Sequence, residues 1–290
     1  MALLFETLVQ GLLIGSGYAL IAIGMAVVYN VSGILNFAHG DFITLGMYAC
    51  LALLLGFGVG PYIGLFLVTP AFAILGILFY LGLIRPLQDT NMLMVVQITL
   101  GLTFIIQNLI LYAFGSIEQV VQTPISAVLL HLTDRFALRL TGVIAGGVSL
   151  GLILGLYVLI QRSDFGRAIR AIHQNPRGAA VCGIDVARVR AATFALAFAV
   201  MGVASCILAP TQPFVPGGGL MISVTAILVL ILGGLGSFHG TLLGGLVVGL
   251  SQTVGTVYLG GTLGLALPYI IFVLVLLFRP GGLVGGRSLA

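Results

Sequence analysis

Long apolar runs separated by short polar stretches follow one another along the chain. Most approach the roughly 20 residues that an α-helix needs to cross a bilayer. The runs cover residues 8–31, 43–57, 63–84, 92–114, 141–160, 191–209, 221–260 and 263–278. The run at 221–260 is interrupted by GGLGSFHG and counts as one or two crossings. The pattern therefore predicts an all-α polytopic membrane protein with eight or nine transmembrane helices.

Two polar interruptions break this pattern, one at residues 29–42 and one at the GGLGSFHG stretch within the run at 221–260. The first, YNVSGILNFAHGDF at residues 29–42, places Asn30, Asn36, His39 and Asp41 between two apolar runs. Polar, non-helical backbone at membrane depth is tolerated only where it is buried in protein or lines a water-filled cavity. We therefore expect broken or half-helices near residues 30–40 and 225–240.

The two interruptions share four residues at an offset of 200 positions. Paired interruptions of this kind are typical of the central site of transporters with internal repeats, although a Gly-rich chain also allows such a match by chance. The matched residues are Gly33, Leu35, His39 and Gly40, and Gly233, Leu235, His239 and Gly240.

The residues of the interruptions have a functional and a structural interpretation. His39 beside Asp41 is a candidate proton relay, because ionisable groups within a span are functional candidates by default. The structural alternative puts the pair at the cytoplasmic end of its helix, where Asp41 caps the following turn and Gly40 permits a tight bend. We favour the structural interpretation and extend it to the second interruption, at Gly236, His239 and Gly240.

Uncharged polar side chains also occur inside the predicted spans. Thr99, Thr103 and Gln107 recur at a spacing of four, which puts them on one face of a helix. Such groups either line a path for a polar zwitterion or hydrogen-bond between helices for stability, and both interpretations stay open. The candidates for a translocation path are Asn30, Asn36, Thr99 and Gln107.

Composition agrees with a membrane protein. Hydrophobic residues make up 60% of the chain and charged residues 6%, whereas a soluble domain carries roughly 25% charged residues. The apolar residues run continuously and do not alternate as in the strands of an outer-membrane barrel. The cysteines, Cys50, Cys182 and Cys206, form no CxxC pair, so we expect small apolar fillers rather than a disulfide framework or a metal site. We expect one transmembrane domain over residues 1–290.

Positive charge is concentrated in one loop, at residues 161–190. The loop at 115–139 has nearly balanced charges, and one predicted helix separates the two loops. Cytoplasmic loops of membrane proteins carry an excess of basic residues, so we expect the 161–190 loop in the cytoplasm, together with Arg279, Arg287 and the C-terminus. We interpret the arginines as a topology signal, not as a nucleic-acid footprint. Those in the loop are Arg162, Arg167, Arg170, Arg177, Arg188 and Arg190.

A short amphipathic helix is predicted inside this loop, over residues 165–174. Ser163 or Asp164 serves as its N-cap, and the helix ends before Pro176 because the residue preceding a proline disfavours helical backbone. Arg167 and Arg170, three residues apart, would project together as two salt-bridge donors. The helix is either a docking knob for a partner or a basic anchor beside anionic lipid.

Three ordered motifs resemble the signatures of a known family, the transmembrane permease subunits of branched-chain amino-acid ABC importers. They are GSGYALIAIGMAVVYNVSGILNFAHGDFITLGMY at residues 15–48, GRAIRAIHQNPRGAAVCGI at 166–184 and LGGLGSFHGTLLGG at 232–245. The resemblance implies four kinds of neighbour: a second, related permease chain, two ATPase subunits at the cytoplasmic face, a periplasmic substrate-binding protein and membrane lipid.

The resemblance also implies that the 161–190 loop docks in a groove of the ATPase. Ala179 and Ala180 followed by Gly183 are similar to the EAA-type loop of ABC importers, with Gly178 where a Glu would complete the triplet. Because the backbone turn shapes the docking knob, we still expect docking. The residues expected to couple to the ATPase are Asp164, Gly166, Arg167, Arg170, Asn175, Pro176, Arg177, Ala179, Ala180 and Gly183.

The expected function is that of an inner-membrane permease without cofactor or metal. It would move branched-chain amino acids, or a related solute such as urea, an amide or an aromatic acid, into the cytoplasm by alternating access. The sequence has no GxxxxGKT phosphate loop, so ATP hydrolysis is expected on a separate chain and no enzyme activity on this one. The alternative is an ion-coupled secondary transporter or channel, which the scarcity of carboxylates within the spans disfavours.

Overall fold

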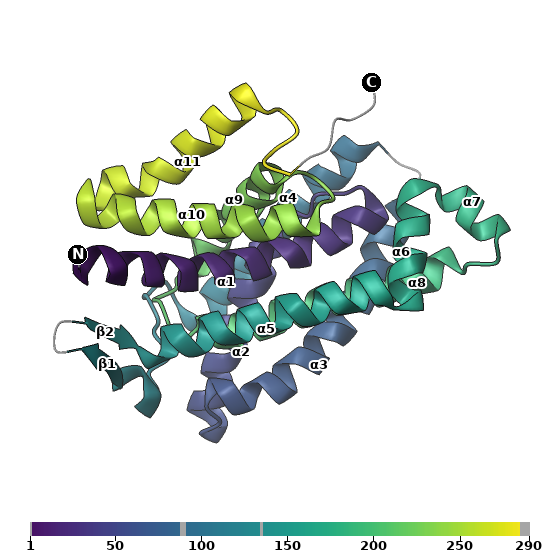
Figure 1. The fold of residues 1–290 in the computed structure, drawn as a ribbon. Coiled ribbons are helices and arrows are strands. Elements are labelled where there is room, and N and C mark those ends of the chain that lie inside the picture. Colours follow the sequence, from purple (N-terminus) through teal and green to yellow (C-terminus); the bar gives the residue numbers. More distant parts are fainter. Residues whose placement is uncertain (1, 88–90, 134–135, 285–290) are drawn as a thin grey trace.

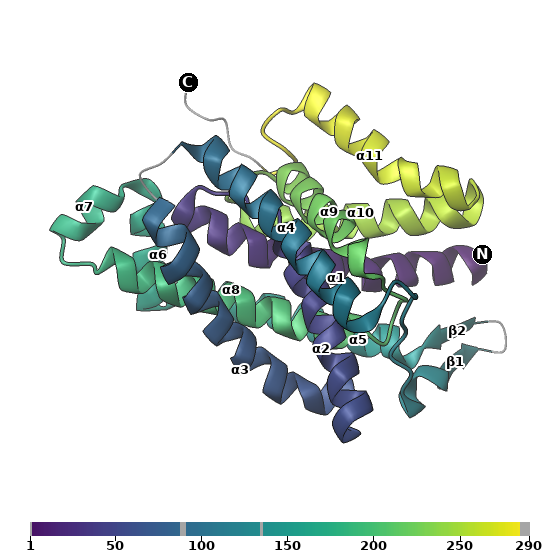
Figure 2. The ribbon, with the colours of Figure 1, turned by 180° about the vertical axis from the view of Figure 1, so that it is seen from behind.

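The chain folds into a bundle of helices with one small hairpin of strands (Figures 1 and 2). The computed structural model describes residues 2–87, 91–133 and 136–284. The helices are α1 (Ala2–Ser32), α2 (His39–Phe57), α3 (Pro61–Phe79), α4 (Met92–Phe114), α5 (Leu140–Arg162), α6 (Asp164–Gln174), α7 (Pro176–Val181), α8 (Val186–Leu208), α9 (Gly219–Gly233), α10 (Phe238–Tyr258) and α11 (Gly261–Phe278). Short turns of helix are η1 (Tyr80–Ile84), η2 (Arg85–Leu87), η3 (Pro124–Ala127) and η4 (Pro216–Gly218). Strands β1 (Leu129–Thr133) and β2 (Phe136–Arg139) pair antiparallel, with Leu129 opposite Arg139.

The number of long apolar helices confirms the predicted fold class. In the described residues, eight helices are long and apolar enough to cross a membrane: α1 to α5, α8, α9 with η4, and α10. The shorter α11 is also apolar. The long run at 221–260 is two helices joined at residues 234–237, so the sequence correctly placed a break there. The chain is an all-α polytopic membrane protein.

Helix α1 lies at the centre of the bundle, next to α5, α8, α9 and α10. Its residues Leu20, Ile23 and Met25 are almost fully buried. Small residues let α10 approach closely, because a Cβ atom on Gly15 would lie 2.8 Å from the carbonyl oxygen of Gly245. Membrane helices associate through such close backbone approach, since lipid supplies no hydrophobic drive between them.

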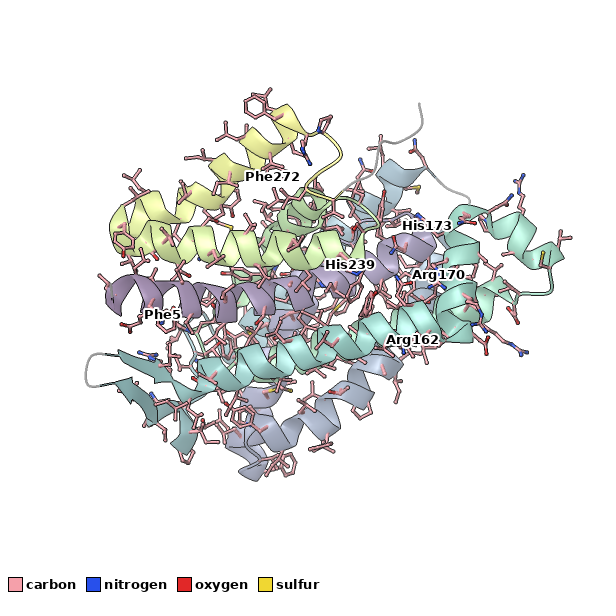
Figure 3. The ribbon with its side chains drawn as sticks, in the orientation of Figure 1. Phe5, Arg162, Arg170, His173, His239 and Phe272 are labelled. Carbon is pink, nitrogen blue, oxygen red and sulfur yellow. The ribbon has the colours of Figure 1, made fainter. Side chains whose placement is uncertain are left out.

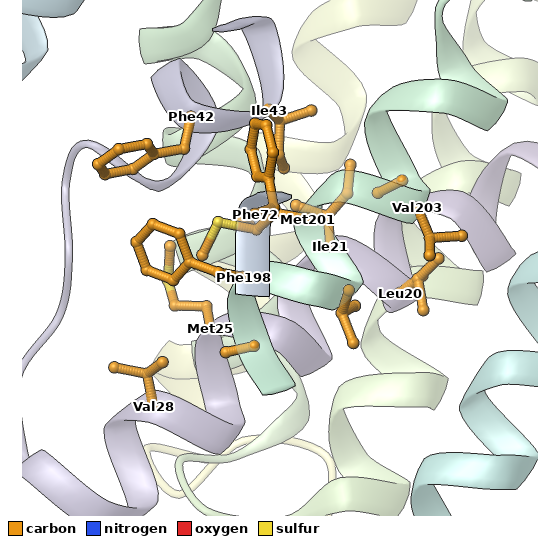
Figure 4. Close-up of a cluster of buried hydrophobic side chains, with 14 of the residues drawn as sticks. Leu20, Ile21, Met25, Val28, Phe42, Ile43, Phe72, Phe198, Met201 and Val203 are labelled. Carbon is orange, nitrogen blue, oxygen red and sulfur yellow. The ribbon is translucent and has the colours of Figure 1, made fainter. Parts of the chain in front are cut away.

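A second packed region joins α2, α3 and α8 (Figure 4). The ring of Phe42 lies 5.4 Å from that of Phe79 and 4.8 Å from that of Phe198, in edge-to-face arrangements. Cys50 and Cys206 are buried in the same core with their sulfur atoms 3.1 Å apart, and both are free thiols. They fill space between α2 and α8, as expected, whereas Cys182 is exposed and does not fill a core position.

The polar loop that contains the hairpin and the basic loop that contains α6 and α7 lie at opposite ends of the bundle. Helices α6 and α7 form one end, and the N-terminal end of α1 lies with the hairpin at the other (Figure 1). Helix α5, which connects them, has 23 residues, about 35 Å at 1.5 Å per residue, and is therefore long enough to cross a bilayer. The hairpin and the α6–α7 pair therefore lie at opposite ends of a helix that is long and apolar enough to span a membrane.

The packing of α1 on α10 yields a stability prediction. A Cβ atom at Gly249 would overlap the backbone of Gly15, whereas one at Gly147 of α5 meets no atom within 4 Å. We expect Gly249→Ala to destabilise the protein by about 1–3 kcal/mol, because the overlap forces two backbones apart. Thermal unfolding in detergent, followed by circular dichroism, measures the change.

The matched control is Gly147→Ala, which should leave the unfolding temperature unchanged or raise it, because alanine favours helix over glycine. An unchanged unfolding temperature for Gly249→Ala would contradict the close α1–α10 contact.

Candidate functional site

The first interruption brings the start of α2 into the interior. Gly33 ends α1 in the left-handed region, with φ of 69°, and its N–H donates to the carbonyl oxygen of Tyr29. The linker at 33–38 then turns back along α1. His39 Nε2 donates to the carbonyl oxygen of Ile21 over 3.0 Å. Ile21 lies 11 residues before the end of α1, about 16 Å along the axis, so α2 begins near the middle of the membrane.

This position corrects the expectation for His39 and Asp41. The pair lies not at the cytoplasmic end of a helix but at a buried helix start, with 1% and 0% of each residue exposed. The polar stretch marked an interruption in the sequence but did not indicate the direction of the linker. Asn36 stabilises the turn locally, since its side chain accepts from the N–H of Ala38 over 3.1 Å.

The start of α9 meets the start of α2 at this depth. The hydroxyl group of Ser223 accepts from the N–H of Gly40 over 2.7 Å and donates to the carbonyl oxygen of Phe37 over 2.6 Å. A Cβ atom on Gly40 would overlap the carbonyl oxygen of Gly219. Gly40 has no positive φ, so it is required for close approach of two helices and not for a tight bend, as the sequence analysis had it.

Asp41 connects this contact to α4. Its Oδ1 accepts from Gln107 Nε2 over 2.9 Å, while its Oδ2 is buried without a hydrogen bond among the described residues. Ala38 is the N-cap of α2, and no side chain caps that position. Asp41 lies in the first turn, where the helix dipole favours a carboxylate, but the structure pairs it with another helix and not with a capping position.

The second interruption, at 234–237, lies at the other end of α9. Gly234 and Gly236 have φ of 105° and 85°, and Ser237 caps α10 by accepting from the N–H of Gly240 over 3.1 Å. The turn predicted at Gly236 is therefore present. His239 is exposed, and its ring lies 5.0 Å from that of Tyr157. His39 and His239 share a motif but differ in burial.

The basic loop forms two short helices, α6 and α7. Ser163 caps α6 by accepting from the N–H of Gly166, and α6 ends at Gln174, so the predicted start and end are confirmed. Asn175 caps α7 by accepting from the N–H of Gly178 over 2.9 Å, and Pro176 is the first residue of that helix. The sequence analysis missed α7, although Asn followed by Pro is a recognisable helix start.

The arginines of α6 do not act as two free donors. Arg167 pairs with Asp164 on the exposed side, while Arg170 turns back and donates to the carbonyl oxygen of Ile160 in α5. The expectation that Arg167 and Arg170 project together as two salt-bridge donors is therefore wrong, because each arginine has a partner within the chain. The far end of the two helices α6 and α7 is also exposed, at Arg177 and at Val181, which is 89% exposed.

The inner face of α6 and α7 is packed on the end of α1. Ile169 and Ile172 of α6, Ala179 of α7 and Val31 of α1 form one small buried cluster. At the end of α1, the last carbonyl groups have no partner within the helix. His173 Nδ1 donates to the carbonyl oxygen of Asn30 over 2.8 Å (Figure 3). Arg190 Nε donates to that of Val31 over 3.1 Å.

The four candidates for a translocation path lie apart. Asn30 lies beside α6 and Gly236, and Asn36 lies in the linker. The hydroxyl group of Thr99 donates to a carbonyl oxygen of its own helix, and only Gln107 reaches Asp41. None of the four lines the larger cavity of the described structure, of about 800 Å³, whereas Gln107 lines a smaller one of about 250 Å³. Their role in a path stays a prediction.

Comparison with known proteins identifies the family to which the chain belongs. Residues 7–276 match the family described as branched-chain amino acid transport system, permease component. The probable branched-chain amino acid transport permease protein LivH of Methanocaldococcus jannaschii is 31% identical over 97% of this chain and 92% of its own length. The high-affinity branched-chain amino acid transport system permease protein BraD of Pseudomonas aeruginosa is 30% identical over 97% and 95%.

LivH of Escherichia coli K12, named a high-affinity branched-chain amino acid transport system permease protein, is 28% identical over 97% of this chain and 95% of its own length. No solved structure matches the chain with statistical significance. The family match covers nearly the whole chain and includes both interruptions and the α6–α7 pair. The chain is therefore a member of the branched-chain amino-acid transport permease family.

Proposed function

We propose that the chain is the permease subunit of an ATP-driven importer, and that it moves branched-chain amino acids or a related small solute inward by alternating access. The observation that carries the proposal is the α6–α7 pair, which projects from one end of the bundle and is fixed to the end of α1. A membrane domain that is driven by a separate ATPase needs a part that projects from the bundle toward the ATPase and is fixed to the membrane helices. Residues 1–290 would act as one transmembrane domain.

The proposed partners are a second, related permease chain, two ATPase subunits and a periplasmic substrate-binding protein. The ATPase would contact the exposed far end of the α6–α7 pair. Asn175, Pro176, Arg177 and Ala180 are exposed there, and Gly183 ends α7 with φ of 86°. Gly166 has a different role, because a Cβ atom there would overlap the end of α5.

The proposed location is the inner membrane, with the 161–190 loop and the C-terminus on the cytoplasmic side. The positive-inside rule supports this orientation, because six of the eleven arginines lie in that loop. Arg279 follows α11, whereas Arg287 lies outside the described residues.

One route can carry the movement of the ATPase to the centre of the membrane. The α6–α7 pair contacts α1 at its last turn, the linker at 33–38 follows directly, and α2 begins beside Ile21. Ser223 then joins the linker and α2 to α9. Displacement of the α6–α7 pair would therefore act on the two helix starts that meet at mid-depth.

The buried carboxylate group of Asp41 is the observation that supports the alternative, an ion-coupled transporter, because ionisable groups within a membrane are functional candidates. Uptake into proteoliposomes separates the two. With ATPase and binding protein present, we expect leucine uptake that requires ATP and persists when proton and sodium gradients are dissipated. Uptake by the permease alone, driven by either gradient, would establish the alternative instead.

The exposed end of α7 yields a docking prediction. We expect Val181→Glu to abolish co-purification of the ATPase, because the change puts a charge on an apolar side chain that is 89% exposed at the proposed interface. The matched control is Val128→Glu beside the hairpin, where the valine is 42% exposed at the opposite end of the bundle. Equal co-purification of the ATPase with both variants would reject the docking surface.

The contact between α6 and α1 yields a coupling prediction. We expect His173→Ala to retain the ATPase but to lose most leucine uptake per ATP hydrolysed, because the hydrogen bond to the carbonyl oxygen of Asn30 is removed. The ratio of uptake to hydrolysis in proteoliposomes measures coupling. Gln174→Ala, a neighbouring exposed residue of α6, is the control and should keep the ratio. A normal ratio for His173→Ala would exclude this contact from the route.

A further inference from the structure

Helix α9 begins inside the protein beside the start of α2, and Asp41 lies where the two helices meet. A Cβ atom on Gly219, the first residue of α9, would overlap Oδ1 of Asp41 and lie 2.6 Å from its Cα atom. Asp41 is 0% exposed. Its carboxyl group therefore lies against the N-terminal end of α9, in addition to accepting a hydrogen bond from Gln107 of α4.

The starts of α2 and α9 both lack a capping side chain. Ala38 is the N-cap residue of α2 and Gly218 that of α9, and no described side chain caps either position. The N-terminus of an α-helix carries roughly +0.5 of an elementary charge. The two helix starts together therefore supply about one positive charge. The carboxylate group of Asp41, in the first turn of α2, supplies one negative charge between them.

No described ion pair involves Asp41. The ion pairs of the described residues join Arg167 to Asp164 and Arg188 to Asp185, at the α6–α7 end of the bundle. Oδ2 of Asp41 is buried without a hydrogen bond among the described residues. A buried ionised group is costly unless its charge is compensated. The two helix starts are the compensation that the structure offers.

We infer that Asp41 is an ionised positioning residue, whose negative charge holds the start of α9 against the start of α2. Separation of the two helices would leave the carboxylate beside one helix start in place of two, so the charge favours the closed junction. Ser223 fixes the same junction through hydrogen bonds to Gly40 and Phe37. The effect on transport rests on the proposed function, in which the route from the α6–α7 pair ends at this junction. The effect on stability does not.

A neutral carboxylic acid is the competing interpretation of Asp41. A neutral group would act through its shape and its hydrogen bond to Gln107, and an amide of the same size would then replace it. The two interpretations differ in charge, so a comparison of an anion with a neutral molecule of the same shape separates them.

A small anion can reach this position. A cavity of about 250 Å³ is lined by Gln107, whose amide donates to Asp41, and by Asn108 and Ser116, which are exposed. Pro216, in the turn before α9, lines the same cavity. Formate has the size of a carboxylate group, and Asp41→Ala leaves space for it.

Anion rescue of the unfolding temperature tests the charge directly, on the permease in detergent. We expect Asp41→Ala and Asp41→Asn both to lower the unfolding temperature, because two helix starts lose their negative charge. Formate should restore part of the unfolding temperature of Asp41→Ala, whereas formamide should not. Asp41→Asn should respond to neither, because its amide fills the space.

The matched control for this rescue is Asp185→Ala. Asp185 also caps a helix, by accepting from the N–H of Arg188, but it is exposed. Formate should not raise the unfolding temperature of this variant, because water already solvates the start of α8.

Leucine uptake by the reconstituted importer supplies a second measurement. We expect Asp41→Asn to lower the initial rate about tenfold, as loss of a charge at a partly buried helix start can do to an equilibrium. Formate should restore part of the rate of Asp41→Ala. Thr193→Val, which removes a buried hydroxyl group that bonds within α8, is the control and should keep the rate.

Three results would overturn the inference. They are a normal uptake rate and unfolding temperature for Asp41→Asn, equal rescue of Asp41→Ala by formate and formamide, and no rescue by formate. The first two assign a neutral acid to Asp41. If Asp41→Ala cannot be purified, the result for Asp41→Asn decides alone.

The two proposals fail separately. Leucine uptake that needs no ATP would reject the importer function and leave the effect of formate on the unfolding temperature standing. ATP-dependent uptake that is unchanged in Asp41→Asn would keep the importer function and reject the role of the charge.

Discussion

Backbone polar groups inside a membrane must find partners within the protein, and this constraint shapes the centre of the molecule. Where the chain leaves α1 and returns to begin α2, the linker has free N–H and carbonyl groups at membrane depth. The hydroxyl group of Ser223 satisfies one of each, at Gly40 and Phe37. One side chain of α9 thus permits a helix to start at mid-depth, and it fixes the relative position of α2 and α9.

Helix α1 connects this central contact to the end of the bundle. Its middle accepts a hydrogen bond from His39, and its last carbonyl groups accept from His173 and Arg190. Close packing on α10 through Gly15 and Gly245 holds the helix along its length. Because α1 is held at both places, it would pass a displacement of α6 on to the linker that follows, as the proposed coupling requires.

The sequence predicted the parts of the fold that depend on local composition. Continuous apolar runs located the spans, and Ser163 and Pro176 marked the start and end of α6, because caps and prolines act within one helical turn. The sequence did not predict the partners of Asp41 and Arg170. Both residues have local alternatives, a cap and a projecting donor, and the structure chooses contacts with Gln107 and with the end of α5. Contacts between distant segments have no local pattern in a single sequence.

The two interruptions also show that a local sequence pattern does not predict contacts between distant segments. They further explain the position of α9, which lies between them. Their motifs match at four positions, yet His39 is buried against α1 and His239 is exposed beside Tyr157. Helix α9 spans the distance between them: it begins at Gly219 against the start of α2, and it ends at the turn whose Gly236 lies beside Asn30 and His173. With 15 residues it is about 22 Å long, a part of the membrane thickness. In the proposed importer, a movement of α6 would therefore act on the central contact from two directions, through the end of α1 and through the turn that follows α9.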